Sequence, residues 1–528
     1  MKANRRRLAG PLSVAIAMTV AVGAWLACRP RAISAFSAET LREAAPPTWT
    51  CAGAPVSFGP VIPPDFAQSN QEQIDCFAWS EFTSLNWPAA GGDGGQVPFG
   101  APGDPGAVQW QTFATADSMF PPDGGKPPDW GTQSQITDDC LAEAGIDKSR
   151  AGQVVPLMSA SKASTQFRLS GSGEAFPFSG PAWLGAKNGT NVWYEVRVSQ
   201  PEYDFVLQNG FYNANTQQAW VDAGKPFVLP QGSLTDGGIG AIELKAAWME
   251  VPDPQNPKWR TFKVSQAVVP DPSSQKCRAT QVALVGLHII HKTANQPTWI
   301  WATFEHKNNV PDNGVDAGTT DWSFFDPSCQ PKTLNNLPKS CTPDGGSTVT
   351  VGCAPNQPPP YYIGEGCPPP VPIQVTRMNR LDSTAAGVNQ AMQQAISGAY
   401  PGSVWSNYQL INVIWSTNPP PPPTTSVPVP AVFLSPQPSA STPLVNTTLE
   451  TYFQTDPSNP FQPSNCIVCH DDATVASTTA VPNPTWSSDF SFVFGDATAP
   501  SSKSKLKSAR RGQGVRQLNP NRMRRIIR

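Results

Sequence analysis

Residues 280–292 read TQVALVGLHIIHK, and after a five-residue connection the chain continues at residues 298–306 with TWIWATFEH. Both segments are rich in β-branched and aromatic residues, which favour strands. The first is apolar on both faces, so it belongs in the centre of a sheet, and the short connection suits a hairpin with a longer loop. The two segments therefore predict the core of a β-rich fold.

Four more segments extend this core and are also rich in apolar and aromatic residues. They are residues 191–199 (NVWYEVRVS), 241–251 (AIELKAAWMEV), 259–269 (WRTFKVSQAVV) and 403–415 (SVWSNYQLINVIW), and the last should return to the main sheet. No repeat of fixed period suggests a propeller. We expect a mainly β fold, with a β-sandwich-like or mixed β-rich body, few short helices and long loops rich in Pro and Gly.

Two segments have helical composition instead. One helix is expected around residues 71–85. A second is expected over residues 385–396 (AAGVNQAMQQAI), with Ser383 as a candidate N-cap and Gly398 at its end.

The N-terminus has the features of an export signal. Basic residues between positions 2 and 7 precede an apolar run over residues 12–27, and small residues at 35–38 offer cleavage sites. The run is short for a stable membrane span, so we expect a cleaved signal peptide over residues 1–38. Cys28 follows Leu-Ala as in a lipoprotein acceptor, although a Trp stands three positions before it, where a small aliphatic residue is preferred.

Cysteine usage agrees with export. Of the 11 Cys, one lies in the signal and two lie in a motif described below, which leaves an even set of eight. In an exported protein this set predicts four disulfides, among the 105 connectivities that eight cysteines allow. The eight are Cys51, Cys76, Cys140, Cys277, Cys329, Cys341, Cys353 and Cys367.

Charge is sparse and unevenly distributed. Charged residues make up 14% of the chain, and 59 Pro and 41 Gly indicate many turns. Residues 39–502 carry 21 basic and 39 acidic side chains, a net charge of −18, whereas residues 503–528 carry ten basic and no acidic ones. An acidic body argues against nucleic acid as a partner. The basic tail is expected to be a solvated end, or to lie on the acidic body or on anionic lipid.

Residues 466–470 (CIVCH) hold the clearest chemical signal in the chain. Two thiols separated by two residues, with a histidine directly after them, fit covalent haem attachment: Cys466 and Cys469 can add across the two vinyl groups while His470 binds the iron. A CxxC redox pair and half of a zinc site are the other hypotheses. No second closely spaced Cys pair completes a zinc tetrad, and the surrounding sequence is rich in turns, whereas a thioredoxin-like pair lies in a βαβ unit.

Together with residues 446–453 (NTTLETYF) and 489–494 (DFSFVF), this motif resembles the haem-binding part of c-type cytochromes. The whole chain is similar to a group of large exported bacterial proteins of unassigned role, in which a Trp-rich body precedes a single C-terminal haem c motif. The resemblance implies covalent haem c on Cys466 and Cys469, His470 as the proximal iron ligand, and electron transfer to or from a redox partner protein.

These features divide the chain into segments. They are a signal peptide (1–38), a loop-rich N-terminal region (39–150), a β-rich body (151–417) with a disulfide-pinned excursion (326–373), a Pro-rich linker (418–439), a haem c segment (440–500) and a basic tail (501–528).

The haem c segment lacks the Met that small single-haem cytochromes use as the second axial ligand. None occurs between His470 and residue 500, and Met523 lies in the basic tail. A segment of about 60 residues is also too short to enclose a haem alone. We therefore expect the haem to dock against the β-rich body, which would supply a wall and a candidate distal ligand.

Three histidines of the body are candidate distal ligands: His288 and His306, and after them His291. If the predicted hairpin closes at its five-residue connection, His288 lies opposite Ala302 and shares a face with His306, while His291 points to the other face. His288 is close to Gly286, where a flat ligand could fit. The alternatives are structural histidines, held by hydrogen bonds, and an iron without a sixth protein ligand.

The expected function is electron transfer by a periplasmic or extracellular protein that carries a single haem. The large body is not explained by that role. The alternatives are therefore a haem-dependent peroxidase or oxygenase with an open iron face, and a haem-based binding or sensor module. Membrane association would come from an uncleaved signal, a lipidated Cys28 or the basic tail.

Overall fold

The computed structural model describes twelve stretches of the chain. They are residues 47–66, 70–89, 98–132, 136–157, 183–270, 276–342, 345–358, 360, 373–438, 444–454, 465–478 and 485–500. The expected signal peptide with Cys28, the basic tail and Cys367 lie outside these residues.

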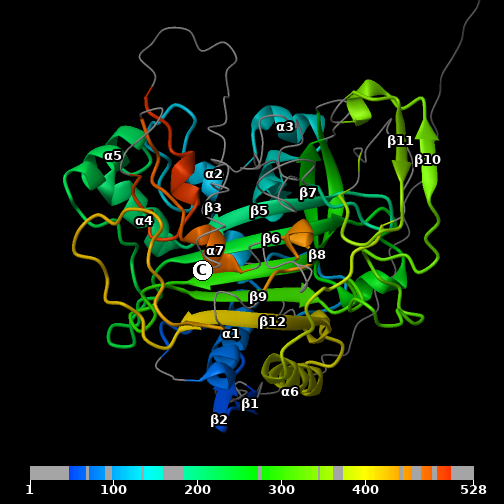
Figure 1. Ribbon diagram of the computed structural model, residues 1–528, viewed down its shortest axis with the longest axis horizontal. Coiled ribbons are helices and arrows are strands. Elements are labelled where there is room, and N and C mark those ends of the chain that lie inside the picture. Colours follow the sequence, from blue (N-terminus) through cyan, green and yellow to red (C-terminus); the bar gives the residue numbers. More distant parts are fainter. Residues whose placement is uncertain are drawn as a thin grey trace, which may run out of the picture. The chain divides into compact units, whose positions relative to one another are not determined.

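A sheet of nine strands carries the core of the described residues (Figure 1). Its strands are β3 (Ala114–Thr115), β4 (Val155–Pro156), β5 (Val192–Val198), β6 (Ile242–Glu250), β7 (Val264–Pro270), β8 (Cys277–His291), β9 (Ile300–His306), β12 (Tyr408–Ser416) and β13 (Pro436–Gln437). The order is β13-β12-β9-β8-β6-β5-β3, with β7 also beside β8 and β4 beside β7. Among these strands only the β4–β7 pair is parallel.

Strand β8 is the centre of the sheet, as its apolar sequence predicted. It pairs with β6 along one edge, and with β9 and then β7 along the other. Where β7 and β9 part, the Tyr408 hydroxyl accepts from the Lys263 N–H (3.1 Å) and donates to the Leu284 carbonyl (2.8 Å). The backbone groups at this junction are therefore satisfied although the ladder is interrupted.

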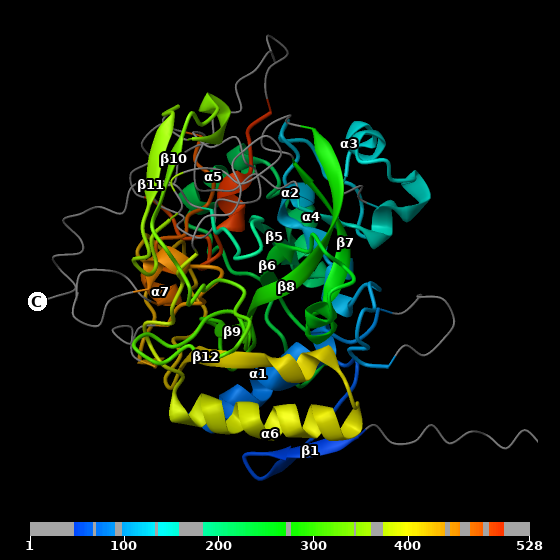
Figure 2. The same cartoon turned by 90° about the vertical axis from the view of Figure 1, so that its right-hand side faces the viewer.

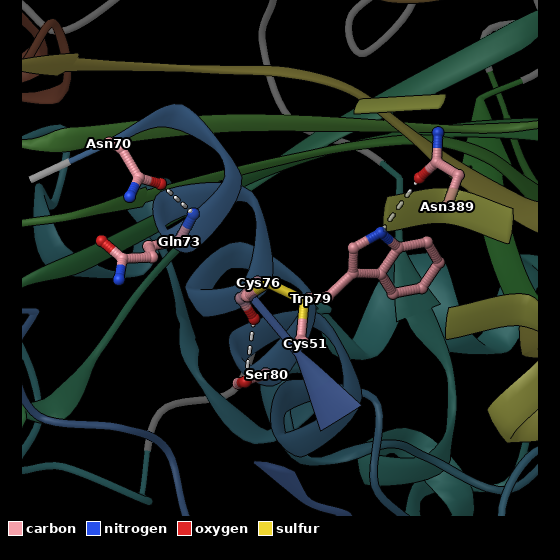
Figure 3. Close-up of a disulfide and its surroundings, with 7 residues drawn as sticks. All are labelled: Cys51, Asn70, Gln73, Cys76, Trp79, Ser80 and Asn389. Carbon is pink, nitrogen blue, oxygen red and sulfur yellow. Dashed lines mark hydrogen bonds between the residues drawn. A yellow bond between two sulfur atoms is a disulfide. The ribbon is translucent and has the colours of Figure 1, made fainter. Parts of the chain in front are cut away.

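Helices α1 (Gln71–Leu85) and α6 (Ser383–Ala399) cover one face of the sheet near β12 (Figures 1 and 2). The indole N–H of Trp79 donates to the Asn389 side chain at 3.0 Å and so joins the two helices (Figure 3). The Cys51–Cys76 disulfide ties α1 to the hairpin of β1 (Thr48–Cys51) and β2 (Ala54–Ser57).

The other face carries α4 (Gln200–Asn209), α5 (Ala214–Asp222) and α7 (Cys466–His470). Their apolar side chains share one cluster with Ile290 of β8 and Trp301 of β9. The large sheet thus lies between helices and loops, and within the described residues the remaining sheets are two-stranded hairpins. Of the two bodies expected, the mixed β-rich one matches this arrangement.

All six strands predicted from composition are present, as β5, β6, β7, β8, β9 and β12, and α1 has the predicted bounds. Helix α6 differs in detail: Asp382 is the N-cap, and Gly398 lies inside the helix. Helices α4 and α5 were not predicted. Their weak amphipathic pattern lies between two strong strands, although Gly210, in the left-handed conformation, ends α4 as a helix-terminating glycine does.

Three disulfides are formed among the described residues, where the cysteine pattern predicted four for the whole chain. Besides Cys51–Cys76, a Cys140–Cys277 bond joins α3 (Asp138–Glu143) to β8, and a Cys329–Cys353 bond brackets the hairpin of β10 (Lys332–Asn335) and β11 (Thr348–Val351). Cys341 is also disulfide-bonded. Such bonds are typical of an oxidising compartment to which proteins are exported. Within the described part of the chain, every helix is too short or too polar to span a bilayer.

Candidate functional site

The CIVCH motif forms the single helical turn α7. The side chain of Asn465 caps it by accepting a hydrogen bond from the Ile467 N–H at 3.0 Å. Residues three apart lie on the same side of a helix, so Cys466 and Cys469 point the same way, and neither is in a disulfide. Two half-buried thiols on one side of a turn are what attachment to two vinyl groups requires.

Ile467 anchors this turn on the sheet. Its side chain is buried in the apolar cluster that also holds Ile290 and Trp301. Figures 1 and 2 accordingly show α7 beside the central strands of the sheet. The peptide of the motif thus lies on the β-rich body, as docking of a haem there would require.

His470 is held in one orientation by three contacts. Its Nδ1 is 2.7 Å from the Phe490 carbonyl oxygen, and its ring makes edge contacts with Trp301 and Phe492, with ring centroids 4.7 and 4.8 Å apart. A carbonyl oxygen can only accept a hydrogen bond, so Nδ1 carries the proton and the lone pair lies on Nε2. A histidine that binds a metal through one nitrogen typically donates from the other in this way. The geometry of His470 therefore fits an axial iron ligand.

The two thiols are neutral. Burial raises the pKa of the Cys466 thiol to about 12, and the Glu450 carboxylate adds to the rise. Burial likewise raises the pKa of Cys469, with Cys466 and Glu450 acting in the same direction. Reactive cysteines and zinc ligands are instead thiolates in electropositive surroundings. Among the described residues, moreover, no group of three or more His, Cys, Asp or Glu side chains is arranged to hold a metal ion. The surroundings therefore do not favour a reactive redox pair.

His288 lies on the same sheet face as α7. Its Nε2 is 2.7 Å from Glu450 Oε1, and Lys245 faces it across the β6–β8 pair. Burial would raise the pKa of the Glu450 carboxyl, but His288 and Lys245 outweigh burial and hold the pKa below its usual range. Because Glu450 also acts on both thiols, the His288–Glu450 pair is a direct electrostatic neighbour of the motif.

Strands β8 and β9 pair one residue out of the expected register. His288 lies opposite Thr303, not Ala302. Because a shift of one residue turns a side chain to the other face, the expectation that His288 and His306 share a face is wrong. The reason lies in the connection, where Trp299 adopts a left-handed backbone (φ 71°) instead of extending β9.

His291 and His306 point away from α7, to the face that α1 covers. His291 bonds through Nδ1 to Glu81 of α1 and through Nε2 to a backbone carbonyl. The expectation that His291 and His288 point to opposite faces of the sheet is therefore confirmed. His306 donates from Nε2 to the Thr261 carbonyl (3.0 Å) and accepts at Nδ1 from the Asn308 N–H (3.2 Å). Burial lowers the pKa of His306 to about 3. The structure does not bring either histidine to the motif.

The NTTLETYF segment is tied to the sheet through buried polar contacts. The Asn446 amide donates to the Thr303 hydroxyl and to the Phe304 carbonyl, both at 2.9 Å. Thr447 donates to the Glu305 carboxylate from its N–H (2.6 Å) and its hydroxyl (2.8 Å). Strand β9 therefore holds this segment through hydrogen bonds to Thr303, Phe304 and Glu305.

The same segment fills the space next to Gly286. A Cβ at this glycine would collide with the Asn446 and Thr448 side chains. The gap expected to admit a flat ligand beside His288 is therefore used by the protein's own chain. The glycine is needed because the segment approaches β8 so closely.

The residues that hold His470 were not assigned from the sequence. Phe492 and the carbonyl of Phe490 belong to the aromatic stretch DFSFVF, which is a visible signal. A hydrogen bond to a backbone carbonyl, however, cannot be predicted from residue type, because every residue has a carbonyl. Trp301 has the sequence signature of an ordinary core residue, and only its position beside α7 distinguishes it.

The known proteins offer no further guide, because no protein-family model, curated protein or solved structure matches the chain. The functional argument therefore depends on the geometry of the motif and its surroundings.

Proposed function

We propose that the chain is an exported haem c protein that transfers electrons through a single haem, attached to Cys466 and Cys469 with His470 as the proximal ligand. The observation that carries the proposal is the 2.7 Å contact between His470 Nδ1 and the Phe490 carbonyl, because it assigns the lone pair to Nε2. When bound, a haem supplies an iron that cycles between two oxidation states by one electron.

The protein's own residues would fix and tune that iron. Trp301 and Phe492 restrict the rotation of the His470 ring, and the Phe490 carbonyl strengthens its nitrogen as a donor. The apolar cluster beneath Ile467 excludes water from one side of the turn. Restricted rotation and low polarity both reduce the rearrangement that accompanies a change of iron charge.

One observation favours a second function, in which the iron binds or activates a small molecule. His291 and His306 have both ring nitrogens engaged away from the motif, and an ionised Glu450 requires His288 Nε2 to carry a proton. None of these histidines is poised as the sixth ligand. The His288–Glu450 pair could then serve as an acid–base pair near an open iron face, as a haem peroxidase, oxygenase or sensor needs.

We further propose a periplasmic or extracellular location and a protein redox partner. An acidic body, with a net charge of −18 over residues 39–502, favours a partner with a basic docking surface and disfavours nucleic acid. Association with a membrane through the signal, Cys28 or the tail belongs to the same proposal.

The test is the absorption spectrum of the full chain, matured in a bacterial host with haem c assembly, with and without cyanide. Electron transfer predicts covalent haem in a low-spin state that cyanide does not change. A high-spin spectrum that shifts on cyanide addition supports the second function instead. A Cys466→Ala/Cys469→Ala variant is the matched control, and a wild-type protein as free of haem as this control would refute both.

A further inference from the structure

We propose that the buried ion pair between Lys292 and Asp489 positions the proximal histidine: it fixes the backbone whose Phe490 carbonyl holds His470, and thereby sets the potential of the iron. The inference rests on the function proposed above and adds positioning residues to it. Neither Lys292 nor Asp489 touches the motif, so both act through the backbone that follows Asp489.

The ion pair ties the connection after β8 to the segment after the motif. The Lys292 ammonium lies 3.0 Å from one Asp489 carboxylate oxygen and 2.8 Å from the other, with both side chains at most 5% exposed. The Leu229 N–H donates to the same carboxylate at 2.8 Å. Removing one member of such a pair leaves a buried charge uncompensated, so the pair constrains its backbone strongly.

The backbone at Asp489 and Phe490 is held in the left-handed region, which is unfavourable for residues with a Cβ. Asp489 and Phe490 both have positive φ, at 59° and 69°. Residues with a Cβ disfavour this region, and two in succession require outside contacts to keep them there. Besides the ion pair, the Trp299 indole donates to the Asp489 carbonyl at 2.9 Å. The next carbonyl, that of Phe490, is thereby turned toward His470.

This arrangement should act on the iron through hydrogen-bond strength. A carbonyl that accepts from Nδ1–H makes the imidazole a stronger donor and stabilises the oxidised iron. If the backbone relaxes, the hydrogen bond lengthens and the potential rises. A tenfold change in the preference between the two oxidation states corresponds to about 59 mV for one electron.

The experiment compares two double variants of the full, matured protein. Lys292→Met/Asp489→Asn removes both charges, leaves no unpaired buried ion, and places at position 489 an Asn, which tolerates a left-handed backbone. Glu195→Gln/Arg197→Met is the matched control, because it removes another buried ion pair (2.7 Å), on β5. We measure covalent haem by mass, the reduction potential, and the deuterium exchange rate of the His470 Nδ1 proton by NMR.

We expect Lys292→Met/Asp489→Asn to retain covalent haem, with a potential at least about 59 mV higher and proton exchange at least tenfold faster, while the control matches the wild type. Equal potentials and exchange rates in all three proteins, or equal shifts in both double variants, overturn the inference but leave the proposed function intact. Absence of covalent haem in the wild type overturns both. Should the first variant not fold, Asp489→Glu, which keeps both charges but moves the carboxylate by one methylene, is expected to raise the potential, and an unchanged potential then refutes the positioning role.

Discussion

The attachment of residues 444–454 to β9 depends on Glu305, and truncating this residue gives a local effect that can be calculated. The Glu305 carboxylate is fully buried, accepts two hydrogen bonds from Thr447 and pairs with Arg377 at 2.9 Å. Glu305→Ala leaves the Arg377 guanidinium buried with only the partly exposed Asp312, at 3.1 Å. Breaking a buried ion pair costs about 3–5 kcal/mol. Because Asp312 remains, we expect the lower end, about 3 kcal/mol.

Hydrogen–deuterium exchange of peptides from residues 444–454 measures this cost directly. If Glu305→Ala lowers the free energy of opening by about 3 kcal/mol, exchange should accelerate by about a hundredfold, since each 1.4 kcal/mol is a factor of ten. Glu305→Gln keeps an oxygen for Thr447 and is expected to cost about half as much. Helix α1 provides the internal reference, because its exchange should stay unchanged. An acceleration below threefold at 444–454, or an equal one in α1, would refute the local anchoring.

Two further predictions concern His288 and Asp75. His288→Gln should leave the visible spectrum of the haem protein unchanged, because Glu450 engages His288 Nε2; loss of low-spin bands in this variant would instead make His288 the sixth ligand. Burial, with help from Asp382 and Glu72, raises the pKa of Asp75 to about 7, although Gln71 opposes the rise. The native carboxyl therefore keeps a proton that the unfolded chain releases near pH 4, so stability is full below that pH and falls as the pH rises toward 7. Asp75→Asn should abolish this fall and raise the free energy of unfolding at pH 8 by at most about 4 kcal/mol, with no gain at pH 4, as urea unfolding of the oxidised protein can measure. Parallel pH profiles of the two proteins would show that Asp75 titrates normally.

The strands could be predicted because their signal is local. Residues 280–292 are apolar on both faces and have no charge before the terminal Lys292, which is typical of a central strand. The helices α1 and α6 have composition and end signals of their own. The β8–β9 register was wrong by one residue because it depends on the backbone conformation of Trp299, and a Trp with positive φ has no sequence signature.

The candidate site was only partly accessible from the sequence. The spacing in CIVCH indicates the proposed attachment residues and the proposed ligand His470, because haem attachment needs those residue types at those positions. The surroundings are set by contacts between distant segments, such as Asp489 with Lys292 and Asn446 with Thr303. The two residues of each pair are more than 140 positions apart in the sequence, so only the tertiary fold brings them together. The position of Glu450 beside His288 could not be inferred for the same reason.

The central claim, a haem joined to this chain through two thioethers, is tested most directly by mass spectrometry of the peptide that contains residues 466–470, from protein matured in a host that assembles haem c. The account predicts one haem on this peptide, bound through both Cys466 and Cys469 and resistant to extraction with acidified acetone. Unmodified thiols at both positions, or a disulfide between them, would contradict it.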